Sequence, residues 1–313
     1  MAPTVSVILP VFNRLEYLRP ALDSVFAQTF SDWELVIADD GSDQPTRTYL
    51  KTLEGQPRIT VVWLAHTGNP GAVRNAALRE ATGEYIAFLD SDDLWLPRKL
   101  ERQVAALRSR PDCCWSYTGS VAFDDTGQIK ADYGPRPWTP YEGAIFEHLV
   151  TGDAAVPTPA VLVERGLLCQ VGGFDEQQRQ FEDYDLWMRF ALRSAVVLVN
   201  EPLTRIRVHQ QHYSARGIPA LENRQRLLGN AQCLVRDSRL RLLIDRLRVQ
   251  TTLNLANALA DTNRLTALRT LLGGCVCWWP YLRWWTGALR VSLKLAIPRA
   301  VLAIYRRRRW QSV

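Results

Sequence analysis

The first hundred residues alternate between short apolar runs and segments whose apolar residues recur at helical spacing. The runs are rich in β-branched and aromatic residues, which is typical of buried strands, whereas the intervening segments have the period of amphipathic helices. The predicted strands cover residues 5–11, 33–38, 59–65 and 85–89, and the predicted helices cover residues 15–26, 44–53 and 71–81. This βαβαβαβ order predicts a parallel sheet with helices on both faces.

The pattern becomes less regular after a predicted helix at residues 97–108. Residues 124–142 contain Gly, Pro, Asp and Trp138 without a period, so they are predicted to form a long functional loop. The chain becomes helical and rich in Arg and Leu from about Ile218. Between these points we expect a strand at 114–123, regular structure at 159–168, a helix at 184–193 and one or two short strands within 196–209.

Charge is distributed unevenly along the 313 residues. Residues 216–313 hold 18 Lys and Arg but only 4 Asp and Glu, whereas residues 1–215 hold 20 basic and 28 acidic residues. This asymmetry predicts an acidic catalytic domain, residues 1–215, and a basic helical extension, residues 216–313, that meets an anionic surface. The six cysteines form no CxxC pair and the chain opens without a recognisable signal peptide, so we expect a cytoplasmic protein with reduced thiols.

The sequence FLDSDDLW, residues 88–95, ends an apolar run at three carboxylates, Asp90, Asp92 and Asp93. Open α/β sheets bind ligands beyond the carboxyl ends of their strands. The spacing of Asp90 and Asp92 suits Mg²⁺ or Mn²⁺, which take a few carboxylates and complete their shell with water and phosphate oxygens. The alternative is that Asp92 or Asp93 caps a helix entered through Pro97.

Two more acidic pairs lie at the ends of predicted elements. Asp39 and Asp40 follow the strand at 33–38, and Glu182 and Asp183 precede the helix at 184–193. No GxGxxG follows the first strand and no GxxxxGK[ST] occurs, which argues against a dinucleotide-binding oxidoreductase and a P-loop enzyme. A nucleotide held without a glycine-rich loop needs a metal on its phosphates.

Seven segments between residue 5 and about residue 215 carry a recognisable pattern: VSVILPVFNR (5–14), QTFSDWELVIADDGS (28–42), GNPGAVRNAAL (68–78), GEYIAFLDSDDLWLPRKL (83–100), VGGFDE (171–176), FEDYDLWMR (181–189) and RVHQQHYS (207–214). In order and spacing they resemble glycosyltransferase family 2. The resemblance implies an α/β fold of the GT-A type, a Rossmann-like nucleotide-binding mixed sheet with helices on both faces, followed here by a C-terminal helical extension. It also implies an inverting enzyme.

The resemblance assigns a nucleotide-sugar site. It implies that this site is lined by Pro10, Phe12 and Asn13 and that Arg74 reaches the nucleotide or its diphosphate. It also implies that Asp40 accepts a hydrogen bond from the base, which suits the imide N–H of uracil or thymine. The simpler alternatives are that Asp40 belongs to a turn beside Gly41 and that Arg74 faces solvent.

The resemblance also assigns metal and ribose contacts. Asp92 is expected to hold Mg²⁺ or Mn²⁺, and Asp90 to contact the ribose or the metal. His209, within RVHQQHYS, could bind the metal or phosphate or position the acceptor, although a single histidine is more often structural. Asp93 is expected to act as a cap or to support its neighbours.

Asp183 is the candidate catalytic base. Transfer to an alcohol needs a group that removes the hydroxyl proton, and a carboxylate at a helix N-terminus is kept ionised by the helix dipole. Glu182 could be this base instead, or could orient the acceptor. The alternative is that Glu182, Asp183 and Asp185 only satisfy amides of the first helical turn.

Residues 275–310 combine a tryptophan cluster with basic residues. Arg283, Arg290 and Lys294 fall on one helical face, and their charges exclude an apolar span of about twenty residues. This pattern predicts a helix at the interface of an anionic membrane, with its tryptophans on the apolar face. The alternative is packing on the catalytic domain or on a dimer partner. The clustered residues are Trp278, Trp279, Tyr281, Trp284, Trp285 and Arg306–Arg309.

The sequence therefore predicts an inverting, metal-dependent glycosyltransferase, peripheral on the cytoplasmic face of a membrane. Its donor would be a nucleotide sugar of UDP or TDP, and its acceptor a saccharide or lipid-linked saccharide in cell-surface polysaccharide synthesis. Two alternatives remain: transfer to a polyprenyl phosphate, which needs no base, and a non-catalytic nucleotide-sugar-binding scaffold. No recognition motif accompanies the Arg run, so nucleic acid is not expected as a partner.

Overall fold

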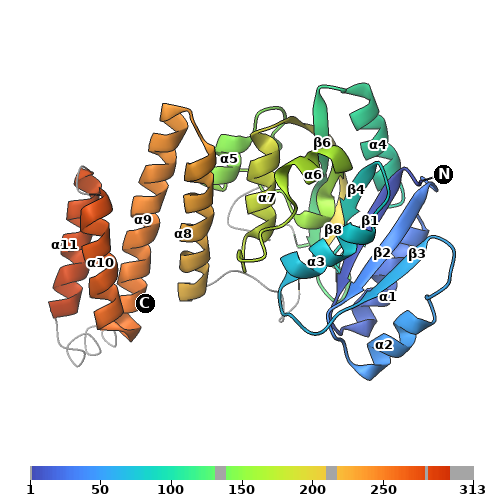
Figure 1. The fold of residues 1–313 in the computed structure, drawn as a ribbon, viewed down its shortest axis with the longest axis horizontal. Helices are drawn as coiled ribbons and strands as arrows, with labels where there is room; N and C mark the ends of the chain where they lie inside the picture. The colour runs from blue at the N-terminus through green and yellow to red at the C-terminus, as the bar shows by residue number, and fades with distance from the viewer. Residues whose placement is uncertain (1, 131–138, 209–216, 279–280, 297–313) are drawn as a thin grey trace. The chain divides into compact units, whose positions relative to one another are not determined.

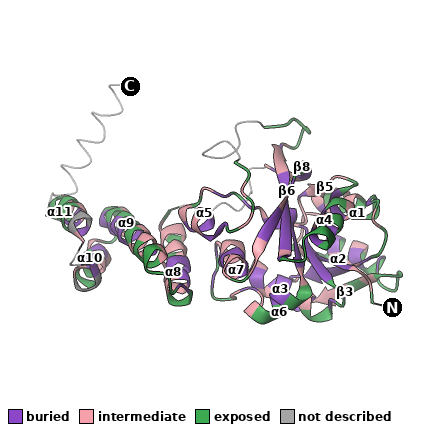
Figure 2. Ribbon diagram, turned by 90° about the horizontal axis from the view of Figure 1, so that it is seen from above, coloured by how far each residue is buried: buried purple, intermediate pink, exposed green. Residues whose placement is uncertain are grey.

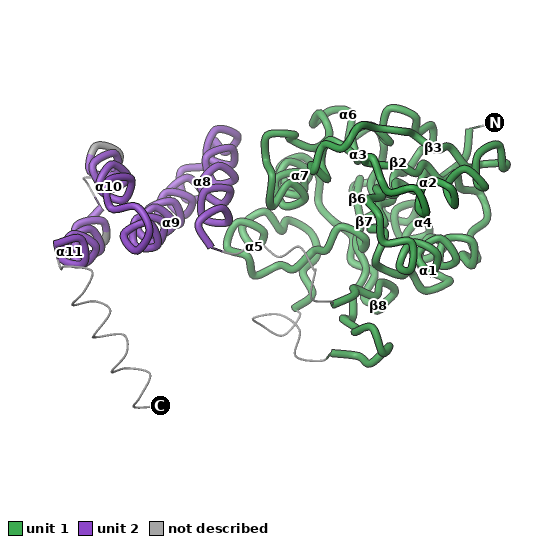
Figure 3. Tube along the Cα trace, turned by 90° about the horizontal axis from the view of Figure 1, so that it is seen from below, with its two compact units in different colours: residues 1–213 green, residues 214–313 purple. Residues whose placement is uncertain are grey.

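The computed structural model describes residues 2–130, 139–208, 217–278 and 281–296. The chain divides into two compact units, one before and one after the boundary between Tyr213 and Ser214 (Figure 3). The first unit carries the sheet and the second is helical.

One sheet of eight strands forms the first unit, in the order β3-β2-β1-β4-β7-β6-β8-β5 (Figure 1). β1 pairs in parallel with β2 and β4, and β2 with β3, as the βαβ pattern predicts. β7 is antiparallel to β4 and β6, and β5 is antiparallel to β8, so the sheet is mixed and the predicted α/β class is confirmed. The strands are β1 (Val5–Val11), β2 (Trp33–Asp39), β3 (Ile59–Trp63), β4 (Tyr85–Phe88), β5 (Leu94–Trp95), β6 (Cys113–Phe123), β7 (Val161–Glu164) and β8 (Ala195–Arg207).

Two helices of this unit begin at a side chain that caps the first turn. The Asp43 carboxylate accepts from Thr46 N at the start of α2, and the Asn69 side chain accepts from Ala72 N at the start of α3. The elements are α1 (Leu15–Phe26), α2 (Gln44–Lys51), α3 (Pro70–Glu80), α4 (Lys99–Ser109), α5 (Phe146–Thr151), the 3₁₀ turn η1 (Thr158–Ala160), α6 (Arg165–Val171) and α7 (Glu182–Ala191). The short elements β5 and α5 were not predicted.

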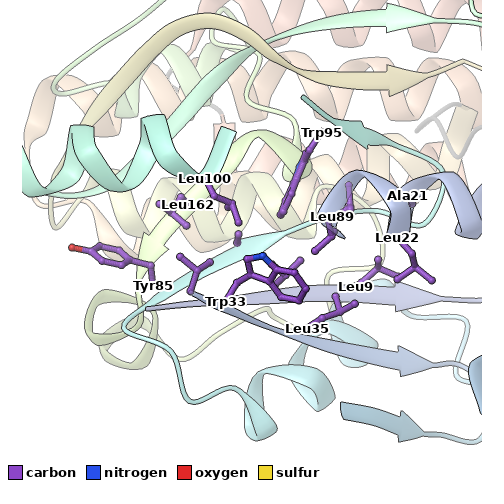
Figure 4. Packing of buried hydrophobic residues seen from close by; sticks show 14 of the residues in the cluster. Leu9, Ala21, Leu22, Trp33, Leu35, Tyr85, Leu89, Trp95, Leu100 and Leu162 are labelled. Carbon is purple, nitrogen blue, oxygen red and sulfur yellow. The ribbon is translucent and has the colours of Figure 1, made fainter. Parts of the chain in front are cut away.

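Alternate residues of the strands face two hydrophobic layers. Leu9 of β1 and Leu35 of β2 join residues of α1, α2 and α4 on one face, where Figure 4 shows Leu22, Trp95 and Leu100. The opposite face packs against α3 and α7, and Figure 2 shows the central strands largely buried. Aromatic rings fill this second layer: Phe88, Trp115, Phe174, Trp187 and Phe190. Helices therefore cover both faces, as the sequence predicts.

Four helices are described in the second unit: α8 (Gly217–Leu234), α9 (Ser238–Thr262), α10 (Arg264–Trp278) and α11 (Leu282–Ala296). α9, α10 and α11 share a core that contains Ala256, Leu271 and Val291. Gly274 of α10 is required there because a Cβ would overlap the ring of Trp284 from α11.

This core corrects part of the predicted membrane face. Trp278 and Trp284 are buried between the helices rather than exposed. Lys294 points to α9, where its Nζ lies 2.9 Å from Asn257 O and 2.9 Å from Asp261 Oδ2. The prediction is therefore wrong for these three side chains, because a periodic apolar face can meet a neighbouring helix as readily as a lipid. Trp279, Arg306–Arg309 and the side chain of Arg283 lie outside the described residues.

The described helices were also searched for a membrane span. None of those in the described ranges is both long enough and apolar enough to cross a bilayer.

Candidate active site

The parallel strands β1, β2 and β4 bring three predicted polar turns to one edge of the sheet. Pro10 lies near the end of β1, opposite Ala38 in the register with β2, and Phe12 and Asn13 follow. Asp40 follows β2 and Asp90 follows β4. Since these strands run in the same direction, their carboxyl ends lie together, where α/β folds bind ligands.

Arg74 of α3 joins two of the predicted acidic groups. Its guanidinium donates to Asp90 Oδ1 at 2.6 Å and to Glu182 Oε1 at 3.0 Å. The side chain is only 6% exposed and packs on the ring of Phe174, so the solvent-facing alternative is wrong. Its buried Nε has no hydrogen-bond partner among the described residues. Burial alone would lower the pKa of Arg74, but the two carboxylates raise it, so this clamp is permanently charged.

Glu182 and Asp183 begin α7 side by side and differ in their partners. Burial and the charge of Asp183 raise the pKa of Glu182 to about 7, and Arg74 partly opposes this rise. Burial also raises the pKa of Asp183, while Arg74 and two hydrogen bonds lower it. Because Glu182 is committed to Arg74, Asp183 is the better placed of the two to take a proton.

Two donors fix the carboxylate of Asp183. Thr158 Oγ1 of η1 donates to Asp183 Oδ2 at 3.0 Å, and the Tyr184 backbone N–H donates to Oδ1 at 2.8 Å. Thr158 is buried, so its hydroxyl has little freedom to turn away. The first-turn alternative holds for one oxygen of Asp183 only, since the other meets a side chain 25 residues away.

Asp92, which follows β4, pairs with an arginine that follows the neighbouring strand β1. Arg14 Nη1 lies 3.0 Å from Asp92 Oδ2, and both side chains are partly exposed. Arg14 and Asn13 adopt left-handed backbone conformations, with φ of 59° and 58°. Non-glycine residues at positive φ often occur at functional sites. Asn13 is held there by Ser42 and Asp43, since its N–H donates to Ser42 Oγ and its Oδ1 accepts from Asp43 N.

Asp93 is buried beneath this edge of the sheet and binds the end of β8. Its Oδ1 accepts the Arg207 backbone N–H at 2.7 Å, and Arg207 Nε donates to Asp92 O at 2.9 Å. Burial and the nearby charges of Asp92 and Asp90 raise the pKa of Asp93. α4 begins at Lys99 without a side-chain cap, so the alternative in which Asp92 or Asp93 caps this helix is wrong.

Asp40 is buried beneath the segment 66–68. Its carboxylate accepts from Thr67 N at 2.7 Å, Thr67 Oγ1 at 2.9 Å and Gly68 N at 3.0 Å. His66 also lies against Asp40, with Nδ1 3.1 Å from Oδ2, and stacks on Phe12 with ring centroids 4.1 Å apart. A carboxylate has about four acceptor sites, so Asp40 keeps little capacity beyond this loop.

Amide side chains of α3 hold the GGFDE segment beside the site. Asn69 Nδ2 donates to Glu176 O at 2.7 Å, and Asn75 exchanges hydrogen bonds with both backbone groups of Phe174. These bonds join segments about a hundred residues apart, which positions α3 next to the start of α7. The motifs GNPGAVRNAAL (68–78) and VGGFDE (171–176) are thus hydrogen-bonded to each other beside the site.

Among the described residues, no group of three or more His, Cys, Asp and Glu side chains is placed to hold a metal ion. Asp90 and Asp92 are 28% and 16% exposed and offer hard oxygen ligands, which fits an ion that takes most of its shell from phosphate and water. His209 lies outside the described residues.

Sequence reasoning missed several residues of this edge. Arg14 is the last residue of VSVILPVFNR and Arg207 is the first residue of RVHQQHYS. These motifs mark both arginines, but they do not indicate which residues the arginines contact. His66 was given no role, and Thr158 has no flanking motif, so nothing in one sequence marks it.

The comparisons with known proteins agree with this geometry. The family described as Glycosyl transferase family 2 matches residues 6–154. TuaG of Bacillus subtilis, a glycosyltransferase provisionally assigned to teichuronic acid biosynthesis, is 40% identical over 151 residues, which are 47% of this chain and 59% of TuaG. The chain therefore spans less than two thirds of that relative.

Two solved structures share the fold. TarS 1–349 of S. aureus in complex with UDP-GlcNAc has a TM-score of 0.62 and 17% identity, covering 92% of this chain and 79% of TarS 1–349. The mannosyltransferase PcManGT of Pyrobaculum calidifontis, in complex with GDP-Man and Mn²⁺, has a TM-score of 0.60 and 19% identity, covering 94% and 87%.

The family match and the relatives, which are named glycosyltransferases, identify the chain as a glycosyltransferase. The match of residues 6–154 to glycosyltransferase family 2 confirms the resemblance found in the sequence.

Proposed function

We propose that this enzyme transfers a sugar, with inversion, from a UDP or TDP donor to a hydroxyl of a saccharide or lipid-linked saccharide. The observation that carries the proposal is the Arg74 clamp, which joins Asp90 at the end of β4 to Glu182, next to Asp183. Through this clamp, the proposed donor-binding edge and the candidate base would belong to one site. A scaffold that only binds nucleotide sugars has no need for a base beside them.

The donor half of the site would lie between Phe12, Asp40 and Asp90. Asp40 would accept the imide N–H of the base in place of one of its present donors, since Thr67, Gly68 and His66 already occupy about four acceptor sites of its carboxylate. Arg74 and Arg14 would supply positive charge near the diphosphate. Neighbours of the same fold were solved with UDP-GlcNAc and with GDP-Man, which supports a nucleotide-sugar donor without identifying the sugar.

We propose that Mg²⁺ or Mn²⁺ is held through Asp92, with Asp90 as the second oxygen donor or the ribose contact. The support is the donor set of two partly exposed carboxylates and the Mn²⁺ bound with GDP-Man in the PcManGT complex. When bound, such an ion offsets the charge that develops on the departing diphosphate. Arg14 would compete with the ion for Asp92, because it already pairs with that carboxylate.

Asp183 would remove the acceptor proton. The carboxylate is oriented by Thr158 and by the Tyr184 N–H, so it needs little rearrangement to accept the proton as the hydroxyl oxygen attacks the anomeric carbon. Attack opposite the leaving diphosphate inverts the anomeric centre. Glu182 would act indirectly, by holding Arg74 beside Asp183.

We further propose a role in cell-surface polysaccharide synthesis at the cytoplasmic face of a membrane. The similarity to TuaG supports the pathway class, and the basic C-terminal helices support the location. The acceptor would then be lipid-linked.

A donor panel tests this function. Purified protein with MnCl₂ would be incubated with UDP-, TDP- and GDP-sugars, and release of the nucleoside diphosphate would be measured by coupled assay. We expect release from one UDP- or TDP-sugar, which is lost in Asp183→Asn and kept in Asp112→Asn, a control at an exposed carboxylate that pairs with Arg110 and has no role in the proposed site. If no donor is cleaved with saccharide, lipid-linked saccharide or polyprenyl-phosphate acceptors, while one still binds, the scaffold alternative is correct.

A further inference from the structure

The last described helix, α11, is apolar on two sides. Trp284, Ala288 and Val291 face the core that it shares with α9 and α10. On the outer side, Trp285, Leu289 and Leu293 recur at a spacing of four residues, which aligns them along one stripe. They are 49%, 63% and 58% exposed, which is unusual for large apolar side chains in a row on a soluble surface.

The neighbouring helix α10 has the same character. Leu265, Leu268 and Leu272 are exposed at a spacing of three and four residues, while Ala267 and Leu271 are buried. Two helices of one unit thus carry rows of exposed apolar side chains.

Charge indicates what covers the stripe of α11. Residues 262–313 contain ten Lys and Arg and neither Asp nor Glu. Arg290 is exposed next to Leu289, and Arg269 is exposed next to Leu268. A second copy docked through the same surface would bring like charges together, since the same patch occurs on both sides of a twofold interface. An anionic lipid surface offers both the apolar phase and the opposite charge.

We propose that the outer face of α11, formed by Trp285, Leu289, Leu293 and Arg290, binds the interface of an anionic bilayer without crossing it. The apolar side chains enter the acyl boundary while Arg290 meets lipid phosphates. This proposal rests on the helical unit alone and not on the proposed function. It replaces the predicted contact through Trp278, Trp284 and Lys294, which the packing of the helices excludes.

Vesicle flotation with the full-length protein tests this surface. We expect wild-type protein to float with vesicles of phosphatidylglycerol and phosphatidylcholine, and to float less with phosphatidylcholine alone. High salt should weaken this binding without abolishing it, because salt screens the arginines but not the apolar contacts. Leu289→Ser combined with Leu293→Ser should lower the bound fraction by about tenfold, and Arg290→Glu should weaken binding mainly at low salt.

Leu242→Ser provides the matched control, because Leu242 is an exposed leucine of α9 in the same unit. It should float like wild type, and circular dichroism should show all variants folded. The proposal is overturned if the double variant floats like wild type, or if wild-type protein stays at the bottom of the gradient. It is also overturned if light scattering shows that the wild-type protein is a dimer and the double variant a monomer, because the stripe is then a protein interface.

Discussion

At the scale of single residues, the account depends on how one carboxylate is prepared to accept a proton. Asp183 is held by Thr158 and by a backbone N–H, and it faces Arg74 from α3, Asp90 from the end of β4 and Glu182 on its own helix. Arg74 favours the ionised form, whereas burial and the neighbouring carboxylates oppose it. The balance among these groups sets the pH at which the site works.

Replacing Asp183 by Asn should remove the base while keeping the size of the side chain. General-base catalysis contributes roughly 10²–10⁴-fold, so turnover should fall by about that factor with donor affinity nearly unchanged. Steady-state kinetics together with donor binding by calorimetry would measure both quantities. Turnover within twofold of wild type would show that another group takes the proton or that the acceptor is a phosphate that needs no base.

Thr158 should act as a positioning residue for Asp183. Thr158→Val removes a hydrogen bond that stabilises the ionised carboxylate, so the pKa of Asp183 should rise. A bond to a charged group is worth about 1.5–3 kcal/mol, so the acidic limb of the kcat/KM profile should move to higher pH by about one unit or more. Thr158→Ser should restore the wild-type limb. If Thr158→Val lowers the rate equally at every pH, Thr158 has only a structural role.

At the scale of elements, α4 contains a charge-bearing side chain that the site does not use. Lys99 is fully buried, its Nζ lies 2.7 Å from Gln103 Oε1 and 4.2 Å from the Trp95 ring centroid. Burial lowers the pKa of Lys99 well below its usual value. In the window between that lowered pKa and the unfolded value near 10.5, the unfolded chain binds more protons than the folded chain, so this residue makes stability rise with pH.

Lys99→Met should remove this dependence. We expect the melting temperature of the variant to exceed that of wild type most at neutral pH, by about 2–4 °C for each kcal/mol, and the gap to narrow toward pH 10. Calorimetry at several pH values would measure the gap, with the exposed Lys51→Met as control. A gap that does not change with pH would mean that Lys99 keeps its charge in the folded chain.

At the scale of the whole molecule, the sequence pattern predicted the features that depend on neighbouring residues, namely the strands and the turns after them. The four strands at 5–11, 33–38, 59–65 and 85–89 and the acidic turns after them follow from periodicity and turn chemistry. The pairs Arg74–Glu182 and Arg14–Asp92 join residues 108 and 78 positions apart, and one sequence carries no record of such distances. The resemblance to a family indicated a role for Arg74, but it did not indicate that Arg74 binds Asp90 and Glu182.

In the helical unit, the sequence pattern identified the apolar residues but not what covers them. Trp278 and Trp284 have the spacing and company of membrane-facing residues, yet they pack against other helices. Periodicity identifies an apolar face but not what covers it. Trp285, one position from Trp284, points outward, so a single-residue difference separates the core of the unit from the proposed lipid-binding stripe.

The central claim is that a nucleoside diphosphate binds at the carboxyl edge of the sheet through a metal ion on Asp92. Titration calorimetry of the full-length protein with UDP and TDP, in MnCl₂ and in EDTA, measures this binding without an acceptor. The account predicts that affinity falls by about tenfold or more in EDTA, which is about 1.4 kcal/mol, and that Asp92→Asn reproduces this loss in MnCl₂. Equal affinity in MnCl₂ and EDTA, or no binding of either nucleotide, would contradict it.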